Sequence, residues 1–369
     1  MCAFVAAILG VVLIPFGARR VRATNLLLHF NDSSYDASHD VREEAMMFPT
    51  PRGEVRARIY APAQHDGPAL AHAPGLVLVH GVHDKGIDEP RLARFARAIA
   101  SSGVLVMTPE IRELADYRVE ATSLDTVEAA AHALSARTGH ARVGLMGMSF
   151  GGGLALVAAS RPSLADHVAF VVAVGAHDDL ERVTRFFVTG VTTGPDGAPA
   201  TVKPHDYGPM VLAYSHTRDL FPEADRVLAE EALGLWLREH PVDAREKAKL
   251  LPDASRARVE LLFEGRFGEL REELLHIIAA RKHEMEDVSP SHHLAAVHAP
   301  VYLLHGAGDT VIPATETKWL ARDTPAPYLR EALVSRAIVH VDMDGKTPVY
   351  EQWQLVDFMA RILGEADAS

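Results

Sequence analysis

The stretch from Val143 to Gly153 constrains this chain more than any other. An apolar run ending at Met146 is followed by Gly147-Met-Ser149-Phe-Gly151 and then by small residues that suit a helix. The two glycines allow a chain reversal too tight for side chains, which would hold Ser149 in a strained, exposed conformation. Chance supplies Gly-x-Ser-x-Gly in about one chain of this length in ten, so the flanking pattern matters. We predict a strand, a sharp turn and a helix with Ser149 at the apex; an ordinary glycine-rich turn is the alternative.

Apolar strands and amphipathic helices alternate around this stretch. Predicted strands cover 75–80, 104–108, 143–146 and 168–174, and predicted helices cover 90–102 and 125–138, the second opening on a capping-box-like Asp125…Glu128. The segments 41–48 and 55–60 flank a turn rich in breakers and suit a strand pair at a sheet edge. Strands return at 300–309 and 332–341, a last helix follows near 355–362, and residues 364–369 are expected to be disordered. Such alternation predicts an α/β fold with a mostly parallel, doubly wound sheet.

The segment 176–298 breaks the alternation. Residues 189–209 are rich in glycine and proline and predict a loop, whereas 228–236 and 270–278 carry the apolar stripes of two amphipathic helices. A helical block inserted between strands is expected above the carboxyl ends of the sheet, where ligands bind. We therefore expect a core formed by 41–175 and 299–363, and a largely helical cap, 176–298, inserted after the sixth strand.

The N-terminal segment, residues 1–25, is expected to be separate from the core. Residues 2–18 carry no charge and are followed by Arg19, Arg20 and Arg22. The apolar run has the short length of a membrane span, and its charges follow it, as in an anchor rather than a cleaved signal. The positive-inside rule would keep the body of such a membrane-associated protein in the cytoplasm. The alternative is a hydrophobic helix packed on the protein itself, in an ordinary cytoplasmic protein.

Charge and cysteine content argue against nucleic-acid binding, disulfide bonds and cysteine-rich metal sites. The net charge of -12, with no basic cluster beyond the N-terminal arginines, argues against nucleic acid as a partner. Cys2 is the single cysteine, so an intrachain disulfide and a cysteine-rich metal site are excluded. His80, His83 and Asp84 lie close together but without zinc-site spacing, and we interpret them as loop structure. We expect neither a metal nor a cofactor, and the sequence leaves the oligomeric state open.

A reactive serine needs a base and an acid. A serine hydroxyl at its normal pKa is a poor nucleophile until a histidine accepts its proton, and a carboxylate orients that histidine. Asp309 follows an apolar strand in a glycine-rich turn, and His340 is the one histidine after it. With the order serine, acid, histidine, Asp309 is the acid and His340 the base. The alternatives are a buried structural histidine at 340, an Asp309 that merely caps the next helix, and Asp178 or Asp179 as the acid.

Acyl transfer also needs N–H donors for the developing oxyanion. One donor follows the nucleophile, which makes it the Phe150 amide. The second comes from the loop after the 75–80 strand, where Gly81 lets the backbone approach and the Val82 amide is the candidate. The His80 side chain is expected to be structural.

These motifs together resemble the α/β-hydrolase superfamily. The residues that carry the resemblance are Val79-His-Gly-Val82, Gly147-Met-Ser-Phe-Gly151, Leu304-His-Gly-Ala-Gly-Asp-Thr-Val-Ile-Pro313 and His340. The likeness covers about 41–175 and 290–363 and points to the esterase, lipase, dienelactone-hydrolase-like or peptidase-like branches. It implies a Ser-Asp-His triad, no cofactor and a cap after the sixth strand. The sequence departs from many esterases in having His-Gly-Val-His-Asp in place of His-Gly-Gly-Gly. Its predicted nucleophile is a serine, which disfavours the chemistry of dienelactone hydrolases, which use a cysteine, and of haloalkane dehalogenases, which use an aspartate.

We therefore expect a serine hydrolase that cleaves a small or medium carboxylic ester through an acyl-enzyme. Ser149, His340 and Asp309 would form the triad, and the Phe150 and Val82 amides the oxyanion hole. A serine peptidase, thioesterase or amidase would use the same residues. An alternative of another class is a non-catalytic, membrane-tethered binding protein on the hydrolase fold.

Overall fold

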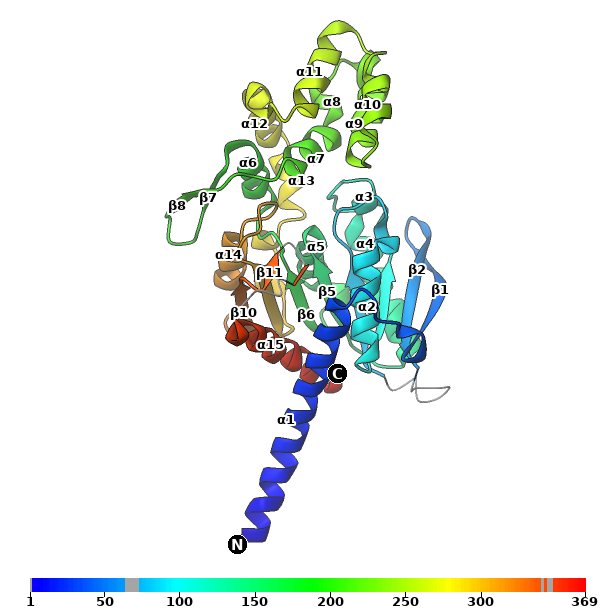
Figure 1. The fold of residues 1–369 in the computed structure, drawn as a ribbon, viewed down its shortest axis with the longest axis vertical. Helices are drawn as coiled ribbons and strands as arrows, with labels where there is room; N and C mark the ends of the chain where they lie inside the picture. Colours follow the sequence, from blue (N-terminus) through cyan, green and yellow to red (C-terminus); the bar gives the residue numbers. More distant parts are fainter. Residues whose placement is uncertain (1, 64–72, 340–341, 344–347) are drawn as a thin grey trace.

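The computed structural model of the chain describes residues 2–63, 73–339, 342–343 and 348–369. Its described strands include an eight-stranded sheet in the order β1-β2-β4-β3-β5-β6-β9-β10 (Figure 1). The strands are β1 (Val41–Thr50), β2 (Gly53–Pro62), β3 (Gly75–Val79), β4 (Leu105–Pro109), β5 (Val143–Met148), β6 (Val168–Val174), β9 (Val301–Gly306) and β10 (Leu329–Ser335). β1 pairs antiparallel with β2, and β2 pairs antiparallel with β4, while the remaining pairs are parallel. The predicted mostly parallel α/β sheet is confirmed.

Helices cover both faces of the sheet, which is why β3, β4, β5, β6 and β9 are buried along their whole length. One face packs on α1 (Cys2–Asn31), α2 (Pro90–Ser101) and α15 (Val349–Asp367). The other packs on α4 (Ser123–Thr138), α5 (Phe150–Ala159) and α14 (Thr315–Asp323). The short α3 (Arg112–Ala115) follows β4. Single 3₁₀ turns occur at Ala37–His39, Gly86–Asp88, Pro162–Leu164, Glu223–Asp225, Phe267–Leu270, Pro290–His292 and Leu294–Ala296.

A helical block is inserted between β6 and β9, after the sixth strand as predicted. Figure 1 shows this inserted segment at the end of the molecule opposite the start of α1. Its elements are α6 (Leu180–Thr189), β7 (Val191–Thr193), β8 (Pro199–Thr201), α7 (Tyr207–Ser215), α8 (Thr217–Leu220), α9 (Arg226–Leu237), α10 (Pro241–Ala248), α11 (Asp253–Phe263), α12 (Arg271–Ala280) and α13 (Lys282–Glu286). The predicted apolar stripe on α12 is buried. On α9 the buried stripe is shifted from the predicted one, to Ala229, Ala232, Leu233 and Leu237.

Three predicted boundaries are wrong. The predicted loop 189–209 contains the β7–β8 hairpin. Helix α4 begins at Ser123, before the predicted start at Asp125, and the carboxylates of Asp125 and Glu128 each bind Arg161 at 2.8 Å in place of forming a capping box. The predicted strand 332–341 stops at Ser335 in β10, and beyond it β11 (Ile338–Val339) and β12 (Asp342–Met343) pair antiparallel with each other.

The N-terminal prediction needs a larger correction. In the part of the chain that the structure describes, no helix is long and apolar enough to cross a membrane. The predicted membrane anchor over residues 2–18 is therefore not supported, and the side chains of residues 2–16 lie outside the described ones.

The arginines that flank the apolar run pair with the C-terminal helix. Arg20 Nε binds Asp357 Oδ1 at 2.7 Å, and Arg22 Nη1 binds Asp367 at 2.9 Å. Arg22 Nε also donates to the Ser102 carbonyl at 2.9 Å. These bonds hold the second half of α1 against α15, and they explain why the tail predicted to be disordered is helical as far as Asp367.

Candidate active site

Ser149 sits at the apex of a strained turn between β5 and α5. Its backbone has φ 53° and ψ −130°, in the positive-φ region that side chains disfavour. A Cβ at position 147 would lie 2.1 Å from the Gly151 carbonyl oxygen, and one at position 151 would lie 2.3 Å from the His80 carbonyl oxygen. Both glycines are therefore required sterically, as the sequence pattern predicts. The Ser149 N–H donates to the Val174 carbonyl at 2.7 Å, which ties the turn to the neighbouring strand β6.

The serine opens onto a cavity of about 400 Å³. The loop after β3 forms one wall: a Cβ on Gly81 would lie 3.3 Å from the Ser149 Cβ. Val82 and Phe150, the two predicted oxyanion donors, line the same cavity. Phe150 is also the first residue of α5, where backbone N–H groups lack partners within the helix.

His80 links the loop after β3 to the chain at Ile111. The Ile111 N–H donates to His80 Nε2 at 3.0 Å, so Nδ1 carries the proton and donates to the Gly81 carbonyl at 2.7 Å. Burial lowers the pKa of His80 to about 4, which keeps the ring neutral. His83 Nδ1 lies 2.9 Å from Asp84 Oδ1. Within the described residues, no group of three His, Cys, Asp or Glu side chains is arranged to hold a metal ion.

Asp309 lies just beyond the carboxyl end of β9 and is 8% exposed. Its Oδ1 accepts the N–H groups of Val311 at 2.8 Å and Ile312 at 3.0 Å, so it does not cap α14, which begins later at Thr315. Its Oδ2 is 3.7 Å from where a Cβ on Gly175 would lie. Gly175 directly follows the residue that accepts the Ser149 N–H, so a single strand, β6, lies between the strands that end at Ser149 and at Asp309.

The predicted base, His340, lies outside the described residues. The chain before it is described: β10 ends at Ser335, and the Ile338 carbonyl oxygen passes within 2.7 Å of where a Cβ on Gly306 would lie. Strand β10 therefore stops well before residue 340, and the segment that follows it crosses the end of β9, beside the turn that carries Asp309. The assignment of His340 stays a prediction.

The rival acids are engaged in an ion-pair cluster that joins α6 to α14. Asp178 is fully buried and binds Arg182 at 2.8 Å, and the same guanidinium binds Glu316 at 2.6 Å. Burial is the main cause that raises the pKa of Asp178 to about 7. Asp179 accepts the backbone N–H of Arg182 at 2.9 Å and so caps α6. Asp178, Asp179 and Asp309 are all absent from the described residues that line the Ser149 cavity, so the lining itself does not choose between them.

Two tyrosines complete the cavity, and sequence reasoning missed both. The Tyr207 hydroxyl, at the start of α7, donates to the Val82 carbonyl at 2.9 Å. Burial raises the pKa of Tyr207 well above its usual value, so this donor keeps its proton. Tyr117 follows α3 and reaches the cavity from the core side. Tyr207 lies in the segment predicted as aperiodic loop and Tyr117 between two elements, so no periodic signal marked either.

Comparison with known proteins agrees with this fold. Residues 80–334 match the family model described as alpha/beta hydrolase fold, which is more than half of the chain. The chain belongs to the α/β-hydrolase fold family. Among curated proteins, none matches its sequence.

Solved structures of this family are similar to the chain at low identity. A puromycin hydrolase is 17% identical with a TM-score of 0.52, over 90% of this chain and 41% of that one. A Pyrobaculum calidifontis esterase is 17% identical with a TM-score of 0.46, over 95% and 90%. An acylaminoacyl peptidase bound to Z-Gly-Gly-Phe-chloromethyl ketone is 14% identical with a TM-score of 0.44, and this chain spans 35% of its length. At 17% identity the likeness to the puromycin hydrolase shows the fold alone.

Proposed function

We propose that this α/β-hydrolase is a serine hydrolase that cleaves a carboxylic ester through an acyl-enzyme. The observation that carries the proposal is the strained conformation of Ser149 at the mouth of a cavity. A side chain is held at φ 53° only where the surroundings enforce it, and such strain concentrates at functional sites. The volume of about 400 Å³ is within the range of small-molecule sites.

In the proposed reaction, Ser149 Oγ attacks the ester carbonyl carbon while His340 accepts the hydroxyl proton. The carbonyl π electrons move to oxygen, and the Val82 and Phe150 N–H groups bind this oxyanion. Collapse of the tetrahedral intermediate breaks the C–O bond, and His340 returns the proton to the departing alcohol. Water then repeats the sequence on the acyl-enzyme and releases the carboxylic acid. Asp309 orients His340 and stabilises its charged form.

The inserted segment supports the proposal by its position. It supplies Tyr207 to the cavity that Ser149 lines, so it is suited to act as the cap that selects the substrate. We assign the core to 41–175 and 299–363 and the cap to 176–298 on this basis.

The test is covalent labelling with a fluorophosphonate probe, followed by intact mass and by turnover of p-nitrophenyl acetate. We expect one added phosphonyl group on Ser149 and measurable ester turnover. Unlabelled wild-type protein without turnover would refute the enzyme and favour a binding protein. A protein that is labelled on Ser149 and cleaves peptide amides but not esters would still use Ser149 as its nucleophile, but it would be a peptidase and not an esterase.

Replacing Tyr207 by phenylalanine tests the positioning of the oxyanion loop. The change removes the bond to the Val82 carbonyl but keeps the ring, so the Val82 amide loses a restraint next to it. One hydrogen bond of this kind is worth about 0.5–1.5 kcal/mol, so we expect kcat to fall by up to about tenfold. The loss should appear in kcat with little change in KM, because the oxyanion forms only in the transition state.

Tyr35→Phe is the matched control, since its hydroxyl binds Asp40 at 2.6 Å and Tyr35 is not among the described residues that line the cavity. A Tyr207→Phe variant that changes KM alone would assign Tyr207 to substrate binding in place of loop positioning.

A further inference from the structure

Tyr117 occupies a backbone position where glycine is usual. Its φ is 58°, and the N–H groups of Tyr117 and Arg118 donate to the carbonyls of Leu114 at 3.2 Å and Glu113 at 2.8 Å. This is the Schellman pattern that ends α3, and the residue at its left-handed position is commonly glycine. A tyrosine there is strained, so its ring must be held by what it contacts.

The ring is held by the inserted segment. The Tyr117 hydroxyl donates to the Leu237 carbonyl, at the end of α9, at 3.0 Å. The ring meets Tyr207 edge-on at 6.1 Å and Tyr214 at 5.9 Å between centroids. Tyr117 is 2% exposed. A residue of the core loop thus reaches deep between α7 and α9.

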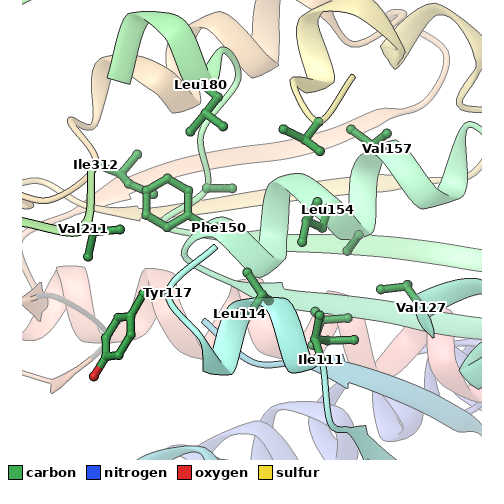
Figure 2. Close-up of a cluster of buried hydrophobic side chains, with 14 of the residues drawn as sticks. Ile111, Leu114, Tyr117, Val127, Phe150, Leu154, Val157, Leu180, Val211 and Ile312 are labelled. Carbon is green, nitrogen blue, oxygen red and sulfur yellow. The ribbon is translucent and has the colours of Figure 1, made fainter. Parts of the chain in front are cut away.

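Tyr117 also separates two cavities. A second cavity of about 390 Å³ lies beside the one that contains Ser149. Of the described residues, Tyr117 and Phe150 alone line both. Figure 2 shows the two rings near Val211 of α7, with the Tyr117 hydroxyl pointing away from Phe150.

The second cavity has apolar walls and a charged mouth. Its buried lining includes Leu180, Phe187, Val211, Leu212 and Met285. Its half-buried and exposed lining is polar and charged, with Arg118, Glu120, His216, Arg218, Asp219, Arg281, Glu284 and Asp287. The buried part favours an apolar group, and the charged part gives water access to the other end of the cavity.

We infer that the second cavity is a subsite for an aromatic or branched apolar group of the substrate, and that Tyr117 sets the largest group it admits. The inference rests on the proposed ester hydrolysis at Ser149. Phe150 forms the other part of the wall, but its backbone serves the oxyanion. Tyr117 is therefore the part of the wall that substitution can remove while the proposed triad and both oxyanion donors are kept, and the ratio of two substrates corrects for its contact with Tyr207.

The test compares wild type with Tyr117→Gly, which suits φ 58° and removes the ring, and with Tyr117→Ala. The probes are p-nitrophenyl acetate, p-nitrophenyl 3-phenylpropanoate and 2-naphthyl acetate, which place the bulk on the acyl or on the alcohol side. We expect the ratio of kcat/KM for a bulky ester to that for p-nitrophenyl acetate to rise about tenfold or more in one of the two series. The thermal midpoint of each variant shows whether it is folded.

Tyr117→Phe is the matched control, because it keeps the volume of the wall and removes the hydroxyl that donates to Leu237. Its ratio should stay close to that of wild type. Equal gains in Tyr117→Phe and Tyr117→Gly would contradict the inference, as would an unchanged ratio in folded glycine and alanine variants. In both of these outcomes the wild type still hydrolyses p-nitrophenyl acetate. A wild type that does not hydrolyse p-nitrophenyl acetate would instead refute the proposed function.

Discussion

Replacing Ser149 by alanine is expected to lower kcat for p-nitrophenyl acetate by about 10³-fold or more and to abolish fluorophosphonate labelling. The reason is that the proposed covalent step has no other nucleophile at the apex of the turn. The fold should survive, because the turn depends on Gly147, Gly151 and the bond from the backbone N–H of residue 149 to Val174, none of which the change removes.

Ser160→Ala is the matched control for this variant. Ser160 ends the same helix α5, and its hydroxyl donates to the Val157 carbonyl at 2.6 Å, away from the cavity. It should retain wild-type turnover and labelling. A Ser149→Ala protein that still forms a covalent phosphonyl adduct and turns over ester at the wild-type rate would place the nucleophile elsewhere.

The second large effect is expected from the proposed base and acid. His340→Ala should lower kcat by about 10³-fold or more, and Asp309→Asn by about 10²- to 10⁴-fold. Asparagine keeps the carbonyl-type oxygen that accepts the Val311 and Ile312 N–H groups, so the turn is preserved while the charge is lost. The double variant Ser149→Ala/His340→Ala should be no slower than Ser149→Ala, because the residues act as one unit.

Kinetics of purified variants with matched thermal midpoints provide the measurement. His283→Ala is the control, since its side chain is 90% exposed on α13. Full activity in His340→Ala would move the base to another histidine. Full activity in folded Asp309→Asn would remove Asp309 from the triad.

The features that sequence predicted well follow local rules. The buried strands are continuous apolar runs because both sheet faces are covered, and the turn at Ser149 follows from sterics at Gly147 and Gly151. The apolar runs before Ser149 and Asp309 predicted the strands β5 and β9 correctly, and the carboxyl ends of these parallel strands lie at the same edge of the sheet.

The predictions that failed depended on distant partners. The arginines after residue 18 have the pattern of a membrane flank, but among the described residues no helix is long and apolar enough to cross a membrane, and Arg20 and Arg22 bind carboxylates of α15. The Asp125…Glu128 pattern suits a helix start, but both carboxylates bind Arg161. In both cases the sequence shows the charged side chains but not the distant residues that they bind. Only the folded structure brings those residues close.

The sequence by itself determined the turn that presents Ser149, the strands beside it and the place of Asp309, because neighbouring residues impose these through sterics and burial. Tertiary structure alone decided the surroundings of the serine. The hydrogen bonds from Tyr207 to Val82 and from Tyr117 to Leu237 join segments far apart in the chain. Neither the hydrophobic periodicity nor the spacing of motifs predicts such contacts. Residues 143–153 are therefore enough to predict the turn, whereas the cavity beside Ser149 depends on how the inserted segment packs.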